Sequence, residues 1–380
     1  MSKTVERIAL VSNSPGSERH LLVHRYGRPG ARPKAYLHAS LHADETPAML
    51  VQHHLIRLLD AADAKGEIRG EILVLPAANP IGLGQYLNFH HVGRYEIGGG
   101  GNFNRNWLDL SEGIAEQVKG KLGSDPAANV ATIRRAIGEK LAAMTPGTEF
   151  SSLRLTLARL AHDADIVLDL HCDSEALLHL FLIPAHWPAA RDLAAELGSA
   201  AQLLADDSGG GSFDETFSTP WTKLASALGP KTPIPPACFA ATVEFRGQAD
   251  VSDELAEPDA RALFRFLQRR GLVAGDPGPL PPLEAEATSF DATDVARSPI
   301  AGIVAYRRAL GARLKKGDLL CEIVDPMATD AVKSRVPVHA GTDGLLLSRA
   351  LHKSVRPGDS LGKIVGTVPL ATRQGYLLED

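Results

Sequence analysis

Two histidines and a glutamate stand at positions that a folded sheet would bring together. His42 and Glu45 lie three residues apart, just after an apolar stretch at residues 35–39, and His171 directly follows another at residues 165–170. The carboxyl ends of such strands open onto the ligand crevice of an α/β sheet, so we expect the three side chains to meet there. Two imidazoles and one carboxylate, with a position left for water, form a common catalytic zinc site. The pattern is therefore typical of a site for one Zn²⁺ per chain, with a chance arrangement of these residues as the alternative.

A neighbouring carboxylate fits the same interpretation. Asp169 precedes His171 by two residues, which places both on one face of the predicted strand. It could accept a proton from an imidazole of the site and so orient it. Chance spacing remains an alternative at this stage, because the chain contains 14 histidines. We interpret a further group as structural or solvated, with His90–His91 in a loop: His38, His53, His54, His90 and His91.

A hydrolase also needs a base, and Glu244 is the best candidate. It ends the apolar run at residues 239–243 and stands beside the bulky Phe245. Such a position can be partly desolvated, which would raise the pKa of the carboxyl toward a value useful for general-base catalysis. The alternative is a surface glutamate paired with Arg246.

Two glycine-rich segments are candidate functional loops. The first, residues 98–101, lies between Arg94 and Asn104-Arg105. Asn104 and Arg105 can hold a substrate carboxylate, with Arg105 as the bidentate partner, and Arg94 could stabilise an oxyanion. Solvated loop arginines are the alternative. The second segment, residues 208–215, is expected to shape the pocket; it lacks the Lys-Ser/Thr of a phosphate-binding loop.

The elements that must position these residues follow from periodicity. Apolar strand candidates alternate with helical patterns at residues 46–64 and 127–162, which predicts an α/β sheet covered on both faces; the strands are residues 35–39, 71–76, 165–170, 178–183 and 240–245. We predict this catalytic domain over residues 1–274. A Pro- and Gly-rich linker follows at residues 275–284.

Residues 285–380 carry short strands and an internal repeat. Gly317 and Gly358 are 41 residues apart, as are Ile323 and Ile364. Two similar halves predict a small closed β domain, which resembles the biotinyl/lipoyl-like barrel-sandwich hybrid. Domains of that kind modify a lysine between their halves. Lys333 lies there, but its neighbours, Val332 and Ser334, do not match the usual modification motifs. We therefore predict an unmodified domain that shapes the mouth of the active site.

Composition narrows the class of protein. The net charge of −5 and the absence of a basic run argue against nucleic acid as a partner. No apolar window is long enough to predict a membrane span. The N-terminus lacks the pattern of a secretory signal, and the three scattered cysteines fit a reducing compartment, so the cytoplasm is the predicted location. A homo-oligomer remains open.

Taken together, the chain resembles the succinylglutamate desuccinylase/aspartoacylase family of zinc carboxypeptidase-like hydrolases. The matching elements occur in family order: His42–Glu45, Asn79–Pro80, Arg94, Asn104–Arg105, Asp169–His171 and Thr242–Glu244. The resemblance implies a carboxypeptidase-like α/β/α domain with a mixed sheet and a zinc ion on His42, Glu45 and His171. It also implies Glu244 as general base, Arg94 as carbonyl-polarising group, and Asn104 with Arg105 as carboxylate binders.

The implied reaction is hydrolysis of a small N-acyl amino acid. One departure is Ala43, where family members commonly carry glycine, and its methyl group is expected to narrow the pocket. Two alternatives remain: a metallocarboxypeptidase that removes C-terminal residues from peptides, and a non-catalytic binding protein with a decayed metal site. The first depends on whether the C-terminal domain caps the cleft.

Overall fold

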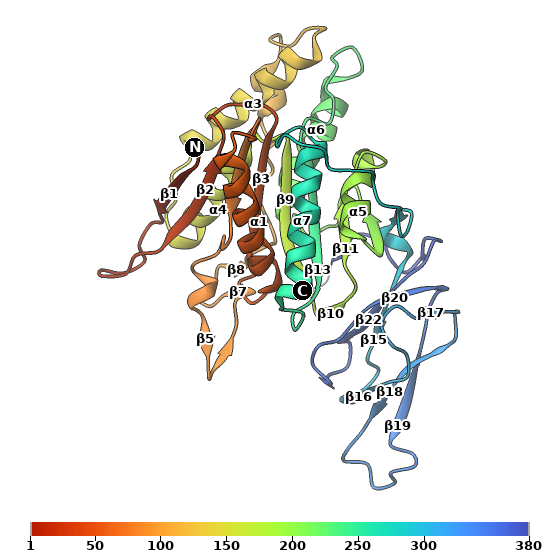
Figure 1. The fold of residues 1–380 in the computed structure, drawn as a ribbon. Helices are drawn as coiled ribbons and strands as arrows, with labels where there is room; N and C mark the ends of the chain where they lie inside the picture. The colour runs from red at the N-terminus through yellow and green to blue at the C-terminus, as the bar shows by residue number, and fades with distance from the viewer. Residues whose placement is uncertain (1, 379–380) are drawn as a thin grey trace.

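A nine-stranded mixed sheet forms the centre of the molecule (Figure 1). The computed structural model describes residues 2–378. The strand order is β1-β2-β4-β3-β9-β13-β11-β12-β14. The strands are β1 (Thr4–Ala9), β2 (His20–Tyr26), β3 (Lys34–Ala39), β4 (Glu71–Leu75), β9 (Ile166–Asp173), β11 (His179–Leu182), β12 (Ala201–Leu204), β13 (Phe239–Gly247) and β14 (Thr288–Ser289). The central strands β4, β3, β9 and β13 run parallel, whereas β1, β2 and β11 are antiparallel to their inner neighbours.

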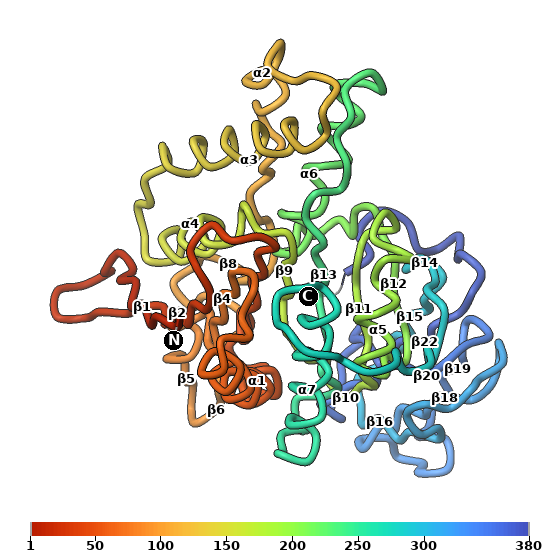
Figure 2. Tube along the Cα trace, turned by 45° about the horizontal axis from the view of Figure 1, so that its top comes forward, coloured from red at the N-terminus to blue at the C-terminus, as the bar shows by residue number. Residues whose placement is uncertain are grey.

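Helices cover both faces of this sheet, as predicted (Figure 2). One apolar core packs the sheet against α1 (Pro47–Ala64), α5 (Arg191–Leu197) and α7 (Asp253–Arg269). The other packs it against α2 (Ile114–Val118), α3 (Pro126–Ala143), α4 (Glu149–Ala161) and α6 (Phe213–Leu228). Because β3 is buried along its whole length, its sequence reads as an apolar run rather than an alternation.

The predicted strands and helices are present within a few residues of the expected bounds, but two short hairpins differ. Tyr86–Leu87 (β5) pairs with His90–His91 (β6), so the prediction of a loop at His90–His91 was wrong. The second hairpin joins β7 (Tyr95–Glu96) to β8 (Gly101–Asn102). Two-residue strands leave no periodic pattern in the sequence, which explains the error. Short 3₁₀ turns occur at Gly82–Gly84, Pro184–His186 and Phe290–Ala292.

The C-terminal region is all-β, as predicted, with small antiparallel sheets around its own apolar core. Its strands are β15 (Thr293–Arg297), β16 (Gly302–Tyr306), β17 (Arg313–Leu314), β18 (Leu319–Val324), β19 (Arg335–His339), β20 (Gly344–Arg349), β21 (Ser354–Val355) and β22 (Ser360–Val365). The internal repeat builds the same turn twice. Gly317 and Gly358 have φ of +90° and +88°, and the carboxylates of Asp318 and Asp359 each accept a backbone N–H three residues earlier.

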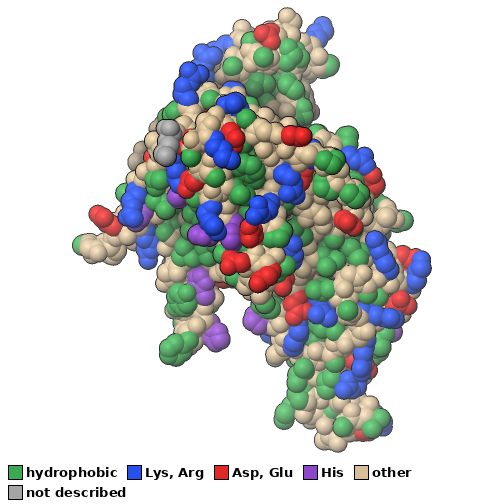
Figure 3. All heavy atoms as spheres, in the orientation of Figure 1, with side chains coloured by type: hydrophobic (Ala, Val, Ile, Leu, Met, Phe, Trp, Pro, Cys, Tyr) green, Lys and Arg blue, Asp and Glu red, His purple; other side chains and the backbone are tan. Residues whose placement is uncertain are grey.

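Short strands join the two regions. Residues 175–176 (β10) pair with β20 of the C-terminal region, and β14 pairs with β12 of the main sheet. Residues 275–284 contain no helix or strand. The domain bounds 1–274 and 285–380 stay a prediction. Within residues 2–378, no helix combines the length and apolar character needed to cross a membrane. Basic and acidic side chains are intermixed over the face in Figure 3, without a continuous basic stripe.

Candidate active site

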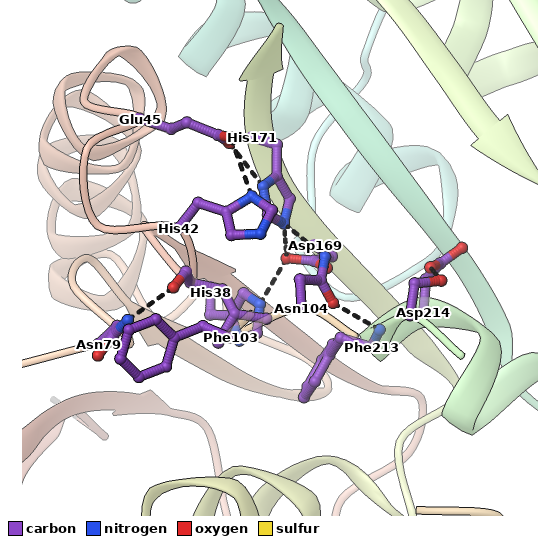
Figure 4. Close-up of polar contacts among 12 residues, drawn as sticks. His38, His42, Glu45, Asn79, Phe103, Asn104, Asp169, His171, Phe213 and Asp214 are labelled. Atoms are coloured by element: carbon purple, nitrogen blue, oxygen red, sulfur yellow. Dashed lines mark hydrogen bonds and ion pairs between the residues drawn. The ribbon is translucent and has the colours of Figure 1, made fainter. Parts of the chain in front are cut away.

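Sheet register brings His42, Glu45 and His171 together. β3 and β9 are parallel neighbours, with Ala39 opposite Leu170, so the turn after β3 lies beside the end of β9. Glu45 Oε1 is 2.9 Å from His42 Nδ1, and Glu45 Oε2 is 2.7 Å from His171 Nδ1 (Figure 4). One ligand atom from each residue lies within 4.8 Å of the others, and all three residues are buried. The three predicted metal ligands therefore form one cluster.

The hydrogen bond at His42 Nε2 shows which nitrogen of His42 carries the proton. His42 Nε2 is 2.8 Å from Asn102 Oδ1, which also accepts the backbone N–H of Asn104 at 2.9 Å. Because that oxygen is an acceptor, His42 Nε2 carries the proton and donates it. The lone pair of His42 is then on Nδ1, beside Glu45. Asn102 was not among the predicted site residues.

His171 lies between two carboxylates. Its Nε2 lies 2.7 Å from Asp169 Oδ1, and a carboxylate can only accept here. The Nδ1 atom lies 2.7 Å from the Glu45 carboxylate, and Nε2 also lies 3.1 Å from the side-chain amide nitrogen of Asn104. A cation bound at Nδ1 would replace the proton there and leave the remaining proton on Nε2, toward Asp169. Asp169 lies where the sequence predicted it, on the same face of β9 and in contact with a candidate ligand. Both imidazoles thus have Nδ1 beside the Glu45 carboxylate, an arrangement suited to a metal ion.

The charged groups of the cluster shift one another's pKa values. Burial raises the pKa of Glu45, but the two imidazoles outweigh it, and the pKa lies well below its ordinary value. Burial lowers the pKa of His171, but Asp169 and Glu45 outweigh burial and raise it. Arg94 Nη1 also contacts Glu45 Oε1 at 3.0 Å and His42 Nδ1 at 3.2 Å. The sequence-predicted Arg94 is therefore at the cluster.

Glu244 lies on β13 directly opposite His171 in register, on the same face of the sheet. Burial, reinforced by the Glu45 carboxylate, raises the pKa of Glu244 to about 8. Its Oε2 is buried without a hydrogen-bond partner among the described residues. Phe245 packs into the core on the other face, so it does not cause this desolvation. Arg246 pairs with Asp259 rather than with Glu244.

Asn104 and Arg105 have different surroundings. The Asn104 side-chain amide donates to Asp169 Oδ2 at 3.1 Å and accepts the backbone N–H of Phe213 at 2.8 Å. Arg105 lies at the cavity, where its Nε donates to the hydroxyl of Tyr376 at 3.1 Å. Tyr376, from the C-terminal segment, is a site residue that the sequence interpretation missed.

The glycine-rich loop after β12 holds that segment in place. The backbone N–H of Leu377 donates to Ser208 O at 2.8 Å. Gly209 has a φ of +86°, and a Cβ there would lie 2.7 Å from Tyr376 Cα. At Gly210 a Cβ would lie 3.0 Å from Arg105 Cδ. The prediction that this loop helps to shape the pocket agrees with its position, because its residues line the cavity.

One cavity of about 1100 Å³ is lined by the three predicted metal ligands together with Arg94, Asn104, Arg105 and Glu244. Residues of the C-terminal region line it together with those of the α/β region; they include Arg297, Arg349, Lys363 and Tyr376. The methyl group of Ala43 is fully buried against Gly82 and Gly93 and is not part of the cavity wall. The expectation that Ala43 narrows the pocket is therefore wrong.

The histidines interpreted as structural or solvated have separate environments. His53 is exposed, and His54 Nε2 contacts Asp253 at 2.8 Å. His90 and His91 lie on the β5–β6 hairpin at the cavity rim, where His91 Nε2 donates to Gly82 O at 3.0 Å. His38 is fully buried and contacts Asp169.

Fold and site together define a class: an α/β protein with a buried group of two histidines and one glutamate at the carboxyl edge of its sheet. The profile of the succinylglutamate desuccinylase/aspartoacylase catalytic domain matches residues 31–270. The chain therefore belongs to this family of hydrolases, as its sequence motifs predicted.

Solved structures agree over nearly the whole chain. A family protein from Shewanella amazonensis is 25% identical with a TM-score of 0.80, over 96% of this chain and 98% of that one. A relative from Shewanella frigidimarina is 23% identical with a TM-score of 0.82, over 96% and 97%. The ectoine utilization protein EutE (DoeB) from Ruegeria pomeroyi is 18% identical with a TM-score of 0.64, over 96% and 99%. The comparison with curated protein sequences gives no match.

Proposed function

We propose that the chain is a zinc-dependent amidohydrolase that cleaves a small N-acyl amino acid into a free amino acid and a carboxylate. One observation carries the proposal. One ligand atom each from His42, Glu45 and His171 lies within 4.8 Å of the others, in a cavity that Glu244 also lines. Family membership supports hydrolysis, whereas zinc, the substrate and the residue roles are proposed here.

The donor set fits a metal ion. Two neutral imidazole nitrogens and one carboxylate are the ligands of many catalytic zinc sites, and each imidazole is oriented through its other nitrogen. His42, Glu45 and His171 would hold the ion. When bound, it supplies Lewis acidity that polarises an amide carbonyl and makes water more acidic.

Glu244 moves the proton in this account. Its carboxylate takes a proton from the attacking water while the water oxygen bonds to the amide carbon. When the C–N bond breaks, the same carboxyl gives that proton to the leaving nitrogen, so the residue ends as it began. Arg94, next to Glu45, is placed to stabilise negative charge on the carbonyl oxygen.

Arg105 is the proposed partner for the substrate carboxylate, because a guanidinium matches a carboxylate in charge and shape. Asn104, which was predicted to bind the substrate carboxylate with Arg105, is assigned a different role here. Its amide already contacts Asp169 and the N-terminus of α6, and its backbone carbonyl accepts from Arg105 Nη1 at 2.9 Å. We propose that Asn104 positions Arg105 and Asp169.

The C-terminal region favours a small substrate over a peptide. Its residues Arg349, Lys363 and Tyr376 line the cavity beside the metal-binding group. Lys363 Nζ reaches across to Asp173 Oδ2 at 2.6 Å, which ties β22 to the end of β9. We propose the cytoplasm as the location, because the three cysteines are buried and free, as is usual in a reducing compartment.

The experiment is a substrate screen on zinc-loaded protein. N-acyl amino acids that differ in acyl group and side chain are incubated beside short peptides, and products are measured by mass spectrometry. Release of amino acid from N-acyl substrates, lost in Glu244→Gln, is the expected result. Faster cleavage of peptides would favour the carboxypeptidase alternative. No turnover by a protein that also binds no metal would favour the decayed-site alternative.

A further inference from the structure

A buried pair of side chains continues the hydrogen-bond chain behind the metal-binding group. Tyr36 and His38 lie on β3, two residues apart on one face, and both are fully buried. His38 Nε2 is 2.6 Å from Asp169 Oδ1, and the Tyr36 hydroxyl is 2.9 Å from His38 Nδ1 (Figure 4 shows His38 beside Asp169). In register, His38 stands opposite Asp169 on the neighbouring strand β9.

The direction of each hydrogen bond can be assigned. The Asp169 carboxylate accepts, so His38 donates through Nε2 and its Nδ1 faces the Tyr36 hydroxyl with a lone pair. The Tyr36 hydroxyl then donates to that lone pair. The hydrogen bonds therefore run from Tyr36 to His38 and from His38 to Asp169. The same Asp169 carboxylate lies 2.7 Å from His171 Nε2.

Asp169 therefore accepts hydrogen bonds from His38 and the amide of Asn104 and forms an ion pair with His171. Removal of His38 would leave His171 as the one remaining partner of Asp169 Oδ1 among those named here. It would also leave space in which the Asp169 carboxylate could rotate. With a cation on Nδ1, His171 would keep its proton on Nε2, and the position of Asp169 would then set the direction of the ring.

We propose that Tyr36 and His38 are positioning residues of the metal site, which act through Asp169 to keep the Nδ1 lone pair of His171 directed at the ion. This inference rests on the metal binding in the proposed function. A core histidine with only a packing role would need its ring alone. The His38 ring does pack on Phe213, with centroids 4.3 Å apart. Its two nitrogens, however, also form hydrogen bonds with Tyr36 and Asp169, and Asp169 contacts the metal-binding group.

Zinc affinity tests the inference without any substrate. Metal-free protein is titrated with Zn²⁺ against a chelator of known affinity, and folding is checked by thermal unfolding of the metal-free form. The variants are His38→Leu, His38→Gln and Tyr36→Phe. His38→Gln keeps a side-chain N–H near the position of Nε2, so it is the conservative variant.

Tyr26→Phe is the matched control. Tyr26 is likewise fully buried, and its hydroxyl donates to a carboxylate, Asp60 Oδ1, at 2.7 Å, but it lies on β2 outside the site. His38→Leu should weaken zinc binding about tenfold or more. Tyr36→Phe should weaken it about fivefold. His38→Gln should recover most of the loss, and Tyr26→Phe should lower stability with unchanged zinc affinity.

Three results would overturn the proposal: unchanged zinc affinity in His38→Leu, no recovery in His38→Gln, or an equal loss of affinity in Tyr26→Phe. Failure of the parent function looks different. A chain that binds zinc with the expected variant pattern but hydrolyses no N-acyl substrate would contradict the proposed reaction alone. A parent chain that binds no zinc would contradict both.

Discussion

The two ends of the cavity are built in different ways. At the metal end, His42 and Glu45 lie in the turn between β3 and α1, and His171 lies near the carboxyl end of the adjacent strand β9; each is at most 3% exposed. At the carboxylate end, Arg105 lies in a loop after β8 and contacts Tyr376, which is 48% exposed and 271 residues away along the chain. The first end depends on sheet register, the second on loops that meet.

This difference suggests where function is fixed and where it varies. Side chains at the metal end are locked by hydrogen bonds on both sides, as with Asp169 and Asn102, so most changes there should abolish the chemistry. At the other end a loop and a C-terminal segment can be altered without disturbing the sheet. We therefore expect the reaction type to reside at the metal end and substrate preference at the carboxylate end.

The largest effect should follow loss of a ligand. His171→Ala removes one of three donors, so zinc content should fall to near zero and turnover to background, as measured by metal analysis and product release. His53→Ala, at an exposed helix position, is the control and should keep both. Stoichiometric zinc in His171→Ala would contradict the assignment of His171 as a zinc ligand.

Glu244→Gln should separate binding from chemistry. The variant keeps the shape of the side chain but cannot accept the proton, so kcat should fall about 10²- to 10⁴-fold. Zinc content and substrate KM should change little, because Glu244 is not among the clustered metal donors. A variant with nearly full kcat would show that the base is another residue.

The pH profile should report the same carboxyl. As a base, Glu244 works only when ionised, and burial raises its pKa above the ordinary 4.5 to about 8. A bound cation opposes that shift, so kcat/KM should rise with pH somewhere between these two values. The rising limb should disappear in Glu244→Gln. Activity that falls through this range would contradict the assignment.

Substitution of Arg105 should have a smaller effect, on substrate binding rather than on zinc content. Lysine keeps the charge but loses the paired donors, so Arg105→Lys should raise KM for N-acyl amino acids about tenfold and leave zinc content unchanged. The same substrates with a carboxamide in place of the carboxylate should not distinguish the variant from the parent. Equal losses on both substrates would mean that Arg105 acts on folding rather than on the carboxylate.

The smallest effect should come from Tyr376→Phe, which removes one hydroxyl next to Arg105. KM for N-acyl amino acids should rise about threefold to tenfold, with kcat nearly unchanged. Tyr86→Phe, on the exposed β5–β6 hairpin, is the matched control. A large drop in kcat would instead couple the C-terminal segment to the metal end.

The same contrast explains what the sequence could predict. β3, β9 and β13 are apolar runs because they are buried, and His42, His171 and Glu244 follow or end them, so spacing located the cluster. Asn102 and His38 act through hydrogen bonds between neighbouring segments, which leave no periodic signal. A contact such as Tyr376 with Arg105 depends on how a distant segment returns to the sheet.

Local features misled the interpretation in two places. Phe245 follows Glu244 in the sequence, but alternation along β13 directs it to the opposite core. Ala43 adjoins a ligand, but its methyl group fills space left by Gly82 and Gly93. Adjacency along a chain does not establish adjacency at a site.

Anomalous diffraction at the zinc edge, on crystals of zinc-loaded protein, tests the central claim most directly. We expect one peak about 2.0–2.1 Å from the Nδ1 atoms of His42 and His171, with a Glu45 oxygen at a similar distance. A peak bonded to Nε2 of either histidine, a peak elsewhere in the chain, or no peak would contradict it.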